Sequence, residues 1–261
     1  MKTILVTGAT RNTGLAVAEK FASEGYNVAI TSRSKESSEK AAAYVAEKYG
    51  VQAKGYALDL ANVAEIEAVF ADVEASFGGL DVFVGNAANL GVDCGLLNSD
   101  EKTYYDITDI NFKGNFFCCQ CAAKIMKKQR GGAIVIIGSV HNHATVQGRA
   151  LYSATKGALL SLTHAMAVEL GAYSIRVNYL AAGAIHTERW DVLDEATVEK
   201  RRANYPLGTE SMPEDIANGV YYLGSDASKT VTGIELTVDS GVSSCILGFT
   251  KPKDFKETED K

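Results

Sequence analysis

Short apolar runs alternate with longer amphipathic stretches from one end of this chain to the other. Seven apolar runs predict strands, at 3–7, 26–31, 51–57, 80–84, 133–137, 174–179 and 234–238. Apolar residues at helical spacing predict helices near 13–24, 36–49, 62–77, 99–128, 150–171 and 213–224, with an irregular helical insertion around 188–204. The strands are apolar on both faces and alternate strictly with helices. The pattern therefore predicts an α/β fold, a doubly wound seven-stranded parallel sheet with helices on both faces.

The composition is that of an ordinary globular protein, with 46% apolar and 22% charged residues among 261. No Pro/Ser-rich linker, low-complexity block or internal repeat divides the sequence. We therefore expect one domain over residues 1–250. Within it, a charged segment at about 187–210 predicts a lid insertion, and the charged residues 251–261 predict a flexible C-terminal tail.

The charge balance narrows the range of partners. A net charge of −6, without a basic stripe, argues against binding to nucleic acid or to an anionic membrane. The first residues enter a strand pattern at once, which leaves no room for a signal peptide, and no apolar run approaches the roughly 20 residues of a membrane span. A cytoplasmic protein is expected.

Three of the five cysteines crowd one apolar helical run. The five are Cys94, Cys118, Cys119, Cys121 and Cys245. A CCxC run could indicate a metal or redox site. Its three side chains point in different directions around a helix, however, and no His or Cys cluster lies nearby at ligand spacing. We expect buried thiols in a reducing compartment and no metal site.

Chemistry is expected beyond the carboxyl ends of the strands, where ligands bind in a doubly wound sheet. Tyr152 and Lys156 open the helix after the fifth strand, four residues apart and therefore on one face. A phenol alone has a pKa of about 10, but a neighbouring ammonium favours the phenolate and lowers that pKa. The pair is thus a candidate general acid/base. The alternative is an ordinary surface tyrosine and lysine, since the spacing alone is common.

A second candidate site is the turn that connects the first strand to the first helix. Its residues include Gly8, Arg11, Asn12, Thr13, Gly14 and Leu15. Glycines let the backbone approach a pyrophosphate closely, and the free N–H groups at a helix N-terminus attract an anion. The position of this turn favours a nucleotide site over a simple connection.

The residues directly after the second strand are polar and include no acid: Ser32, Arg33 and Ser34. An acid here would bind the ribose diol of NAD, whereas a cation and hydroxyls suit the 2′-phosphate of NADP. Arg11 could reach the same phosphate from the glycine turn, so NADP(H) is the expected cofactor. Asp59, next to Leu60 at the end of the third strand, is a candidate either for contact with the adenine amino group or for a helix cap.

Seven short motifs, in this order, resemble those of the short-chain dehydrogenase/reductase family. They are the glycine turn, residues 85–88, Asn111, residues 138–139, the YxxxK pair, residues 176–187 and residues 238–241. The resemblance extends to about residue 241. It implies a single-domain Rossmann fold and an NADP(H)-dependent oxidoreductase that interconverts a ketone and a secondary alcohol by hydride transfer.

The resemblance also implies the roles of individual residues. Ser139 would hold the substrate carbonyl oxygen and Tyr152 would protonate it, while Lys156 would lower the tyrosine pKa and bind the nicotinamide ribose. Asn111 would hold a water that passes protons to Lys156. Further cofactor contacts are implied for Asn86, Ala87, Ala88, Gly183, Ile185 and Thr187, in addition to Tyr152 and Lys156.

Several residues depart from the motifs of the family: Asn12, Gly85, Ala88, Ala182 and Ser240. Asn12 replaces a glycine where positive φ is often required, and asparagine is the side chain that best tolerates it. Ala182 stands where proline is usual, which predicts a more mobile loop over the nicotinamide. None of the changes removes a catalytic atom, so activity is expected.

The loops after the fourth, fifth and sixth strands should wall the substrate pocket. Their candidate residues are Asn89, His141, His143, Gln147, His186 and Trp190. This wall is more polar than a fatty-acyl chain requires, which favours a sugar- or polyol-like or a hydroxysteroid-like substrate. A 3-oxoacyl thioester reductase is the alternative. A reductase of carbon–carbon double bonds is disfavoured by the retained YxxxK spacing, and a non-catalytic NADP-binding regulatory protein by the intact catalytic set.

Small residues on the helix at 150–171 would let another helix approach closely. The resemblance implies that this helix and the one at 99–128 pair with a second copy across a two-fold axis. We expect a homotetramer, or a homodimer.

Overall fold

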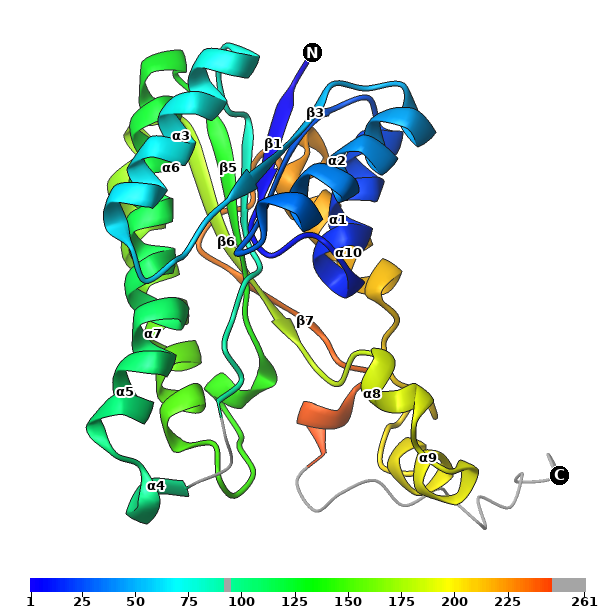
Figure 1. Ribbon diagram of the computed structural model, residues 1–261. Coiled ribbons are helices and arrows are strands. Elements are labelled where there is room, and N and C mark those ends of the chain that lie inside the picture. The colour runs from blue at the N-terminus through cyan, green and yellow to red at the C-terminus, as the bar shows by residue number, and fades with distance from the viewer. Residues whose placement is uncertain (92–94, 246–261) are drawn as a thin grey trace, which may run out of the picture.

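The computed structural model describes residues 1–91 and 95–245 and contains a seven-stranded sheet (Figure 1). The strands are β1 (Thr3–Val6), β2 (Asn27–Ser32), β3 (Ala53–Ala57), β4 (Val82–Gly85), β5 (Gly132–Ile137), β6 (Ile175–Ala182) and β7 (Glu235–Val238). They lie in the order β3-β2-β1-β4-β5-β6-β7, and each pair of neighbours is parallel. The predicted doubly wound parallel sheet is confirmed.

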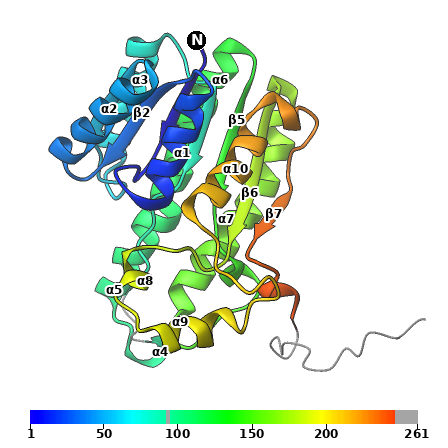
Figure 2. The ribbon, with the colours of Figure 1, turned by 90° about the vertical axis from the view of Figure 1, so that its right-hand side faces the viewer.

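Helices cover both faces of the sheet (Figures 1 and 2). One face carries α1 (Asn12–Ser23), α2 (Lys35–Tyr49) and α10 (Pro213–Gly224), and the other carries α3 (Val63–Phe77), α6 (Asn115–Gln129) and α7 (Ala150–Leu170). Each layer buries its own apolar cluster, with Phe21 of α1 in one and Phe70 of α3 in the other. Because both faces are covered, the strands are apolar on both sides, as the sequence pattern required.

Local capping signals fix the ends of the helices. The Ser34 side chain accepts a hydrogen bond from the Ser37 N–H and caps α2, and Asn62 caps α3 in the same way. Both helices end at a glycine with positive φ, Gly50 and Gly78. These signals explain why the predicted ends of both helices lie within one residue of the observed ends.

The single helix predicted at 99–128 is interrupted. It consists of α5 (Glu101–Thr108), a π-helical turn (Asp109–Gly114) and α6, and the short α4 (Gly95–Asn98) precedes it. Asn111 lies in the π-helical turn, a rare conformation that often occurs at functional sites. The prediction of a continuous helix was wrong here because apolar spacing does not reveal one widened turn.

Strand β6 runs three residues beyond its predicted end and finishes at Ala182. Ala182 is paired with Val238 of β7 and is only 4% exposed. Proline at this position would lack the backbone N–H and disfavour a sheet, whereas alanine allows the strand to continue. The residue that was expected to loosen the loop over the nicotinamide is therefore part of the sheet.

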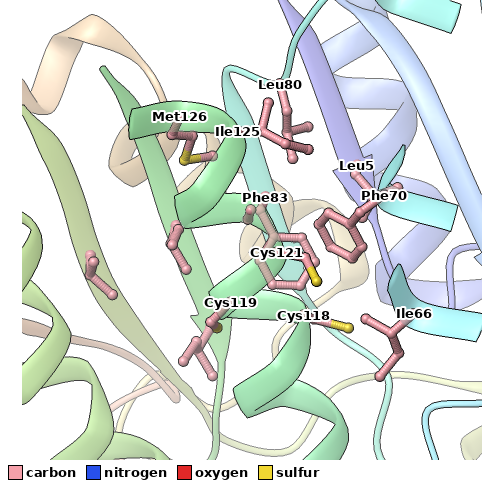
Figure 3. Close-up of a cluster of buried hydrophobic side chains, with 14 of the residues drawn as sticks. Leu5, Ile66, Phe70, Leu80, Phe83, Cys118, Cys119, Cys121, Ile125 and Met126 are labelled. Carbon is pink, nitrogen blue, oxygen red and sulfur yellow. The ribbon is translucent and has the colours of Figure 1, made fainter. Parts of the chain in front are cut away.

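Three cysteines of α6 lie in the apolar layer between α3 and the sheet (Figure 3). Cys118, Cys119 and Cys121 are buried beside Phe70 and Phe83. Burial raises the pKa of all three thiols, that of Cys119 to about 12. The prediction of buried thiols is confirmed for these three, and Cys94 lies outside the described residues.

After β6 the chain leaves the sheet over residues 187–210 and forms α8 (Glu188–Asp191) and α9 (Glu195–Arg202). We call residues 187–210 the lid. A parallel bridge between Ile185 and Ser211 closes its base, and the lid projects beyond the carboxyl end of β7 (Figure 1). The tail predicted at 251–261 lies outside the described residues. Within the described part of the chain, no helix has both the length and the apolar character to cross a membrane.

Candidate active site

Tyr152 and Lys156 lie on successive turns at the start of α7. They are only 8% and 3% exposed, and Lys156 Nζ lies 5.5 Å from the centre of the Tyr152 ring. Nζ also donates a hydrogen bond of 3.1 Å to the carbonyl of Ile137, the last residue of β5. The two side chains therefore share one buried face at the carboxyl end of the sheet, which excludes the alternative of a surface pair.

Burial shifts the pKa values of both groups. Desolvation lowers the pKa of Lys156 from 10.5 to about 8. Desolvation also raises the pKa of Tyr152, and this rise is only partly offset by a hydrogen bond with Ser139 and by the charge of Arg149. The sequence-based expectation of a lowered tyrosine pKa was therefore wrong for the protein alone, because the cost of burying a phenolate is the largest contribution.

Ser139 follows β5 and is buried next to this pair. Its Oγ accepts a hydrogen bond of 3.3 Å from the His141 N–H and caps the short turn at 140–142. Its own N–H donates to the Tyr179 hydroxyl at 3.0 Å. Since Oγ accepts within its own turn, its O–H remains a donor for an oxygen placed between Ser139 and Tyr152.

Asn111 is completely buried and links three segments. Its Oδ1 accepts from the Asn89 N–H at 2.7 Å, and its Nδ2 donates to the Asn89 carbonyl at 2.8 Å and to Thr155 Oγ1 at 3.3 Å. The side-chain amide thus holds the loop after β4 against α7. The water-holding role that the family resemblance implies stays a prediction.

The turn between β1 and α1 requires its small residues. Gly8 has a φ of 63°, and a Cβ on Gly14 would come within 2.7 Å of the Asn86 amide nitrogen. Asn12 has a φ of 48°, so it adopts the left-handed conformation expected where the family has glycine. None of the described side chains caps α1. Its first N–H groups therefore lack helical partners and suit a phosphate.

Asn86 fastens the end of β4 to this turn. Its Nδ2 donates to the carbonyls of Thr7 and Gly8 at 2.8 and 3.0 Å. The N–H groups of Asn86 and Ala87 donate to Thr7 Oγ1 at 3.0 and 3.1 Å, and Ala88 follows them. The bonds hold the ends of β1 and β4 together at the point where the strand order reverses, which is where ligands bind in such sheets.

A cavity of about 730 Å³ opens between the glycine turn, the end of β2 and the start of α2. Its lining contains three cations, Arg11, Arg33 and Lys40, and no carboxylate among the described residues. Guanidinium and ammonium groups at the start of a helix suit a phosphate. The residues of this cavity therefore fit the phosphorylated ribose of NADP.

The two serines of the cavity also have structural partners. Ser32 Oγ donates to the Ser34 carbonyl at 2.8 Å and lies 2.8 Å from Ser38 Oγ, while Ser34 caps α2. Both hydroxyls thus shape the loop that presents Arg33. Asp59 Oδ1 accepts from the Ala61 N–H at 2.9 Å. Since Asn62 caps α3, the predicted helix-cap role of Asp59 was wrong; its contact with adenine, and that of the adjacent Leu60, stay predictions.

Three further predicted cofactor residues lie between β6 and α8. Gly183 packs against Asp239, where a Cβ would come within 2.6 Å of the Asp239 Cβ. Ile185 forms the bridge to Ser211, and Thr187 stands directly before α8. These residues follow the carboxyl end of β6, as the ligand position in a doubly wound sheet requires.

His141 is the histidine nearest to Tyr152. Its ring lies edge-on to the Tyr152 ring with 5.7 Å between centres, and its Nδ1 is 3.1 Å from Thr145 Oγ1. Burial, together with the charge of Arg149, lowers the pKa of His141. A neutral imidazole at neutral pH can donate or accept a hydrogen bond beside the reacting carbon.

The other two candidate histidines have carboxylate partners within the protein. His143 Nε2 lies 2.6 Å from Glu235, and His186 lies 2.8 Å from Glu210 through Nδ1 and 2.9 Å from Asp191 through Nε2. Both carboxylates raise the pKa of His186, with Glu210 the larger cause. His143 and His186 therefore hold protein segments together, in addition to any contact with substrate.

The remaining pocket candidates differ in exposure. Trp190 is buried in the lid and stacks on His186, with 5.9 Å between ring centres. The Arg201 guanidinium lies 5.2 Å from the centre of the Trp190 ring. Asn89 uses its side chain in local bonds to Asp106 and Gly91. Gln147 is exposed on the loop before α7.

The structure adds four residues that sequence reasoning missed: Tyr179, Glu210, Glu235 and Lys40. Tyr179 is part of an apolar strand pattern, and Glu210 and Glu235 are single acids far along the chain from their histidine partners, so nothing local distinguished them. Lys40 could have been found, because Ser37, Lys40 and Tyr44 follow Ser34 at helical spacing on the face that lines the cavity.

Comparison with known proteins agrees with this site. Residues 8–243 match the family described as Enoyl-(Acyl carrier protein) reductase. The chain is 38% identical over 243 residues to the 3-oxoacyl-[acyl-carrier-protein] reductase FabG of Staphylococcus aureus strain Mu50, covering 92% of this chain and 98% of that one. It is 35% identical over 243 residues to a probable NADP-dependent mannitol dehydrogenase of Yarrowia lipolytica, covering 92% of this chain and 87% of that one.

Solved structures give the same result. A gluconate 5-dehydrogenase from Burkholderia cenocepacia J2315, in complex with NADP and tartrate, superposes with a TM-score of 0.88 at 30% sequence identity, covering 94% of this chain and 96% of that one. The family match over residues 8–243 contains every motif described above, and the relatives and solved structures each cover more than nine-tenths of the chain. The chain therefore belongs to the short-chain dehydrogenase/reductase family of oxidoreductases.

Proposed function

We propose that this protein is an NADP(H)-dependent oxidoreductase that interconverts a ketone and a secondary alcohol. The observation that carries the proposal is the burial of Ser139, Tyr152 and Lys156 side by side at the carboxyl end of β5. A hydroxyl donor, a phenol and an ammonium at one point suit the protonation of an oxygen that is losing its double bond. When bound, the cofactor supplies or accepts the hydride.

Each of the three residues has its own task in reduction. Ser139 donates a hydrogen bond to the carbonyl oxygen and polarises it. Tyr152 transfers its proton to the same oxygen, and its raised pKa keeps it protonated until then. Lys156 is anchored to Ile137 and places a positive charge under the phenol, which stabilises the phenolate formed by the transfer. Asn111 holds the loop after β4 against α7 and so helps to keep Tyr152 and Lys156 in place.

The cavity beside α2 supports NADP over NAD. Arg11, Arg33 and Lys40 offer a 2′-phosphate three cations, and the described lining has no acid to bind a free ribose diol. Arg11 also lies 3.6 Å from Glu188 of the lid. This ion pair is exposed on both sides, so a phosphate can compete for the guanidinium at little cost.

For the substrate, we propose a polyol, a sugar acid or a hydroxysteroid. His141 beside Tyr152 and the polar loops after β4 and β5 favour hydroxylated compounds. Among the similar proteins are the mannitol dehydrogenase, the gluconate 5-dehydrogenase and a 3alpha-hydroxysteroid dehydrogenase of Mediterraneibacter gnavus, 35% identical. A 3-oxoacyl thioester is the second candidate, favoured by the similarity to FabG.

A purified-protein assay tests the proposal. Oxidation of NADPH and of NADH should be followed with sugars, a steroid ketone, an acetoacetyl thioester and an enoyl thioester, and reduction of NADP with the alcohols that correspond to the ketones. We expect turnover of at least one carbonyl with NADPH. Tight NADPH binding without turnover of any compound would favour the non-catalytic regulatory alternative, and reduction of an enoyl thioester alone would favour a carbon–carbon double bond as substrate.

A homotetramer, or a homodimer, is our proposal for the assembly. Tyr104 and Tyr105 of α5, Phe116 of α6 and Val168 of α7 are exposed apolar side chains on the helices expected to pair. Multi-angle light scattering measures the mass directly, and a Val168→Asp variant should shift it toward the monomer. The cytoplasmic location expected from the sequence likewise stays a prediction.

A further inference from the structure

The hydroxyl of Tyr179 lies between two residues of the candidate active site. Tyr179 stands on β6, is completely buried, and accepts a hydrogen bond of 3.0 Å from the Ser139 N–H. The same oxygen lies 3.2 Å from the Lys156 carbonyl and 3.4 Å from the Ser139 carbonyl. A phenol carries one proton, and the shorter distance assigns it to the Lys156 carbonyl. Tyr179 thus connects the end of β5 to the second turn of α7.

The neighbouring residues make room for this ring. Gly138 precedes Ser139, and a Cβ on Gly138 would overlap the Tyr179 ring and hydroxyl. Burial raises the pKa of Tyr179, so the hydroxyl stays protonated at neutral pH and can both accept and donate. A large residue on β6 and the glycine that directly follows β5 therefore form one complementary pair next to Ser139.

We propose that Tyr179 is a positioning residue that fixes Ser139 relative to α7 and so aims the Ser139 hydroxyl at the oxygen on which Tyr152 acts. The inference rests on the proposed function, since it assigns Ser139 a role in that chemistry. Ser139 itself has an extended backbone beyond the end of β5 and caps only a three-residue turn, so its backbone needs an external anchor. The Tyr179 hydroxyl supplies that anchor through the N–H of the same residue.

The variant Tyr179→Phe tests the proposal, because it keeps the ring and removes only the hydroxyl. We expect kcat for ketone reduction to fall by about 10- to 100-fold, as small displacements of reacting groups do. The KM and the directly measured Kd for NADPH should not change. Tyr221→Phe is the control: that hydroxyl pairs with Glu24 on the far side of α1, and its loss should leave kcat unaltered.

Two further measurements separate positioning from general destabilisation. The Ser139 amide should exchange its hydrogen about 10-fold faster in Tyr179→Phe, because it loses one hydrogen bond. In a Ser139→Ala background, adding Tyr179→Phe should cost little further activity, since the group to be aimed is already absent. The proposal would be overturned by an unchanged kcat in Tyr179→Phe, or by an unchanged exchange rate of the Ser139 amide. It would also be overturned if Tyr179→Phe lowered kcat as much in the Ser139→Ala background as in the wild type.

The amide measurement does not depend on turnover. If the wild-type protein reduced no ketone, the proposed function would fail, and the exchange rate of Ser139 would still decide whether Tyr179 holds it. If the wild-type protein and Tyr221→Phe were active and Tyr179→Phe equally so, only the positioning role would be lost. A Tyr179→Phe protein that unfolded at the assay temperature would also refute the proposal, because a positioning hydroxyl leaves the packing of the ring intact.

Discussion

Lys156 should make the stability of this protein depend on pH in the alkaline range. Its ammonium is buried, and burial lowers its pKa from 10.5 in the unfolded chain to about 8 in the folded protein. Between these values the unfolded chain binds the proton and the folded protein does not, so stability rises with pH. The contribution of Lys156 to the free energy of unfolding is fully present above pH 10.5, and it is lost as the pH falls through about 8.

The size of the effect follows from the shift. One pKa unit corresponds to about 1.4 kcal/mol, so the full change is about 3 kcal/mol and the change between about pH 7 and about pH 9.5 is about 2 kcal/mol. Other groups titrate in the same pH range, but their contributions to the free energy of unfolding cancel when the wild type is compared with Lys156→Met. Methionine keeps the length and apolar stem of lysine and removes the charge.

Urea unfolding at a series of pH values measures the difference. Relative to Lys156→Met, the wild type should become more stable by about 2 kcal/mol from about pH 7 to about pH 9.5. Lys124→Met, at an exposed position of α6, is the matched control, and its difference from the wild type should stay constant. A constant difference for Lys156→Met as well would refute the reasoning, since it would mean that burial does not disfavour the ammonium.

Three other changes test other parts of the site. Tyr152→Phe should lower kcat/KM by about 10²- to 10⁴-fold while a fluorescence titration shows NADPH binding as in the wild type, and an active variant would remove Tyr152 from the mechanism. Arg33→Asp should weaken NADPH binding by about 10- to 100-fold and leave NADH binding equal or tighter; equal loss of both would count against the phosphate cavity. Glu210→Gln should lower the free energy of unfolding in urea by about 1–2 kcal/mol near neutral pH, because Glu210 accepts two hydrogen bonds from Arg202 and one from His186. The effect is no larger because Arg202 is half exposed and water screens its charge. The pKa of Glu210 is lowered from 4.5 to about 2, so the advantage of the wild type should persist above 4.5 and vanish as pH falls toward 2; an advantage that survived there would disprove the ion-pair account.

The sequence predicted the elements that local rules determine. Parallel strands need apolar residues on both faces, and helices such as α2 begin at a capping serine and end at a glycine. The placement of Tyr152 and Lys156 could be predicted for the same reason, since a spacing of four residues on a helix puts both on one face whatever the fold around them.

Properties that depend on the surroundings could not be predicted. The direction of the Tyr152 pKa shift is set by burial, which no spacing reveals. His143 pairs with Glu235 and His186 pairs with Glu210, and both glutamates come from other segments of the chain. The π-helical turn contains Asn111, whose side chain bonds to Asn89 in another segment, and the local apolar pattern shows neither the turn nor this contact.

Burial of Tyr152 and Lys156 also bears on how the rates of the proposed reduction and oxidation depend on pH. A phenol with a raised pKa holds its proton at neutral pH, which is the form that reduction of a ketone consumes. Oxidation of an alcohol needs the phenolate, and forming it inside the protein carries the desolvation cost that raised the pKa. Lys156 offsets part of that cost as long as it is charged, which holds below about 8. We therefore expect the rate of ketone reduction to be highest around neutrality and the rate of alcohol oxidation to gain as rising pH removes the proton from the phenol.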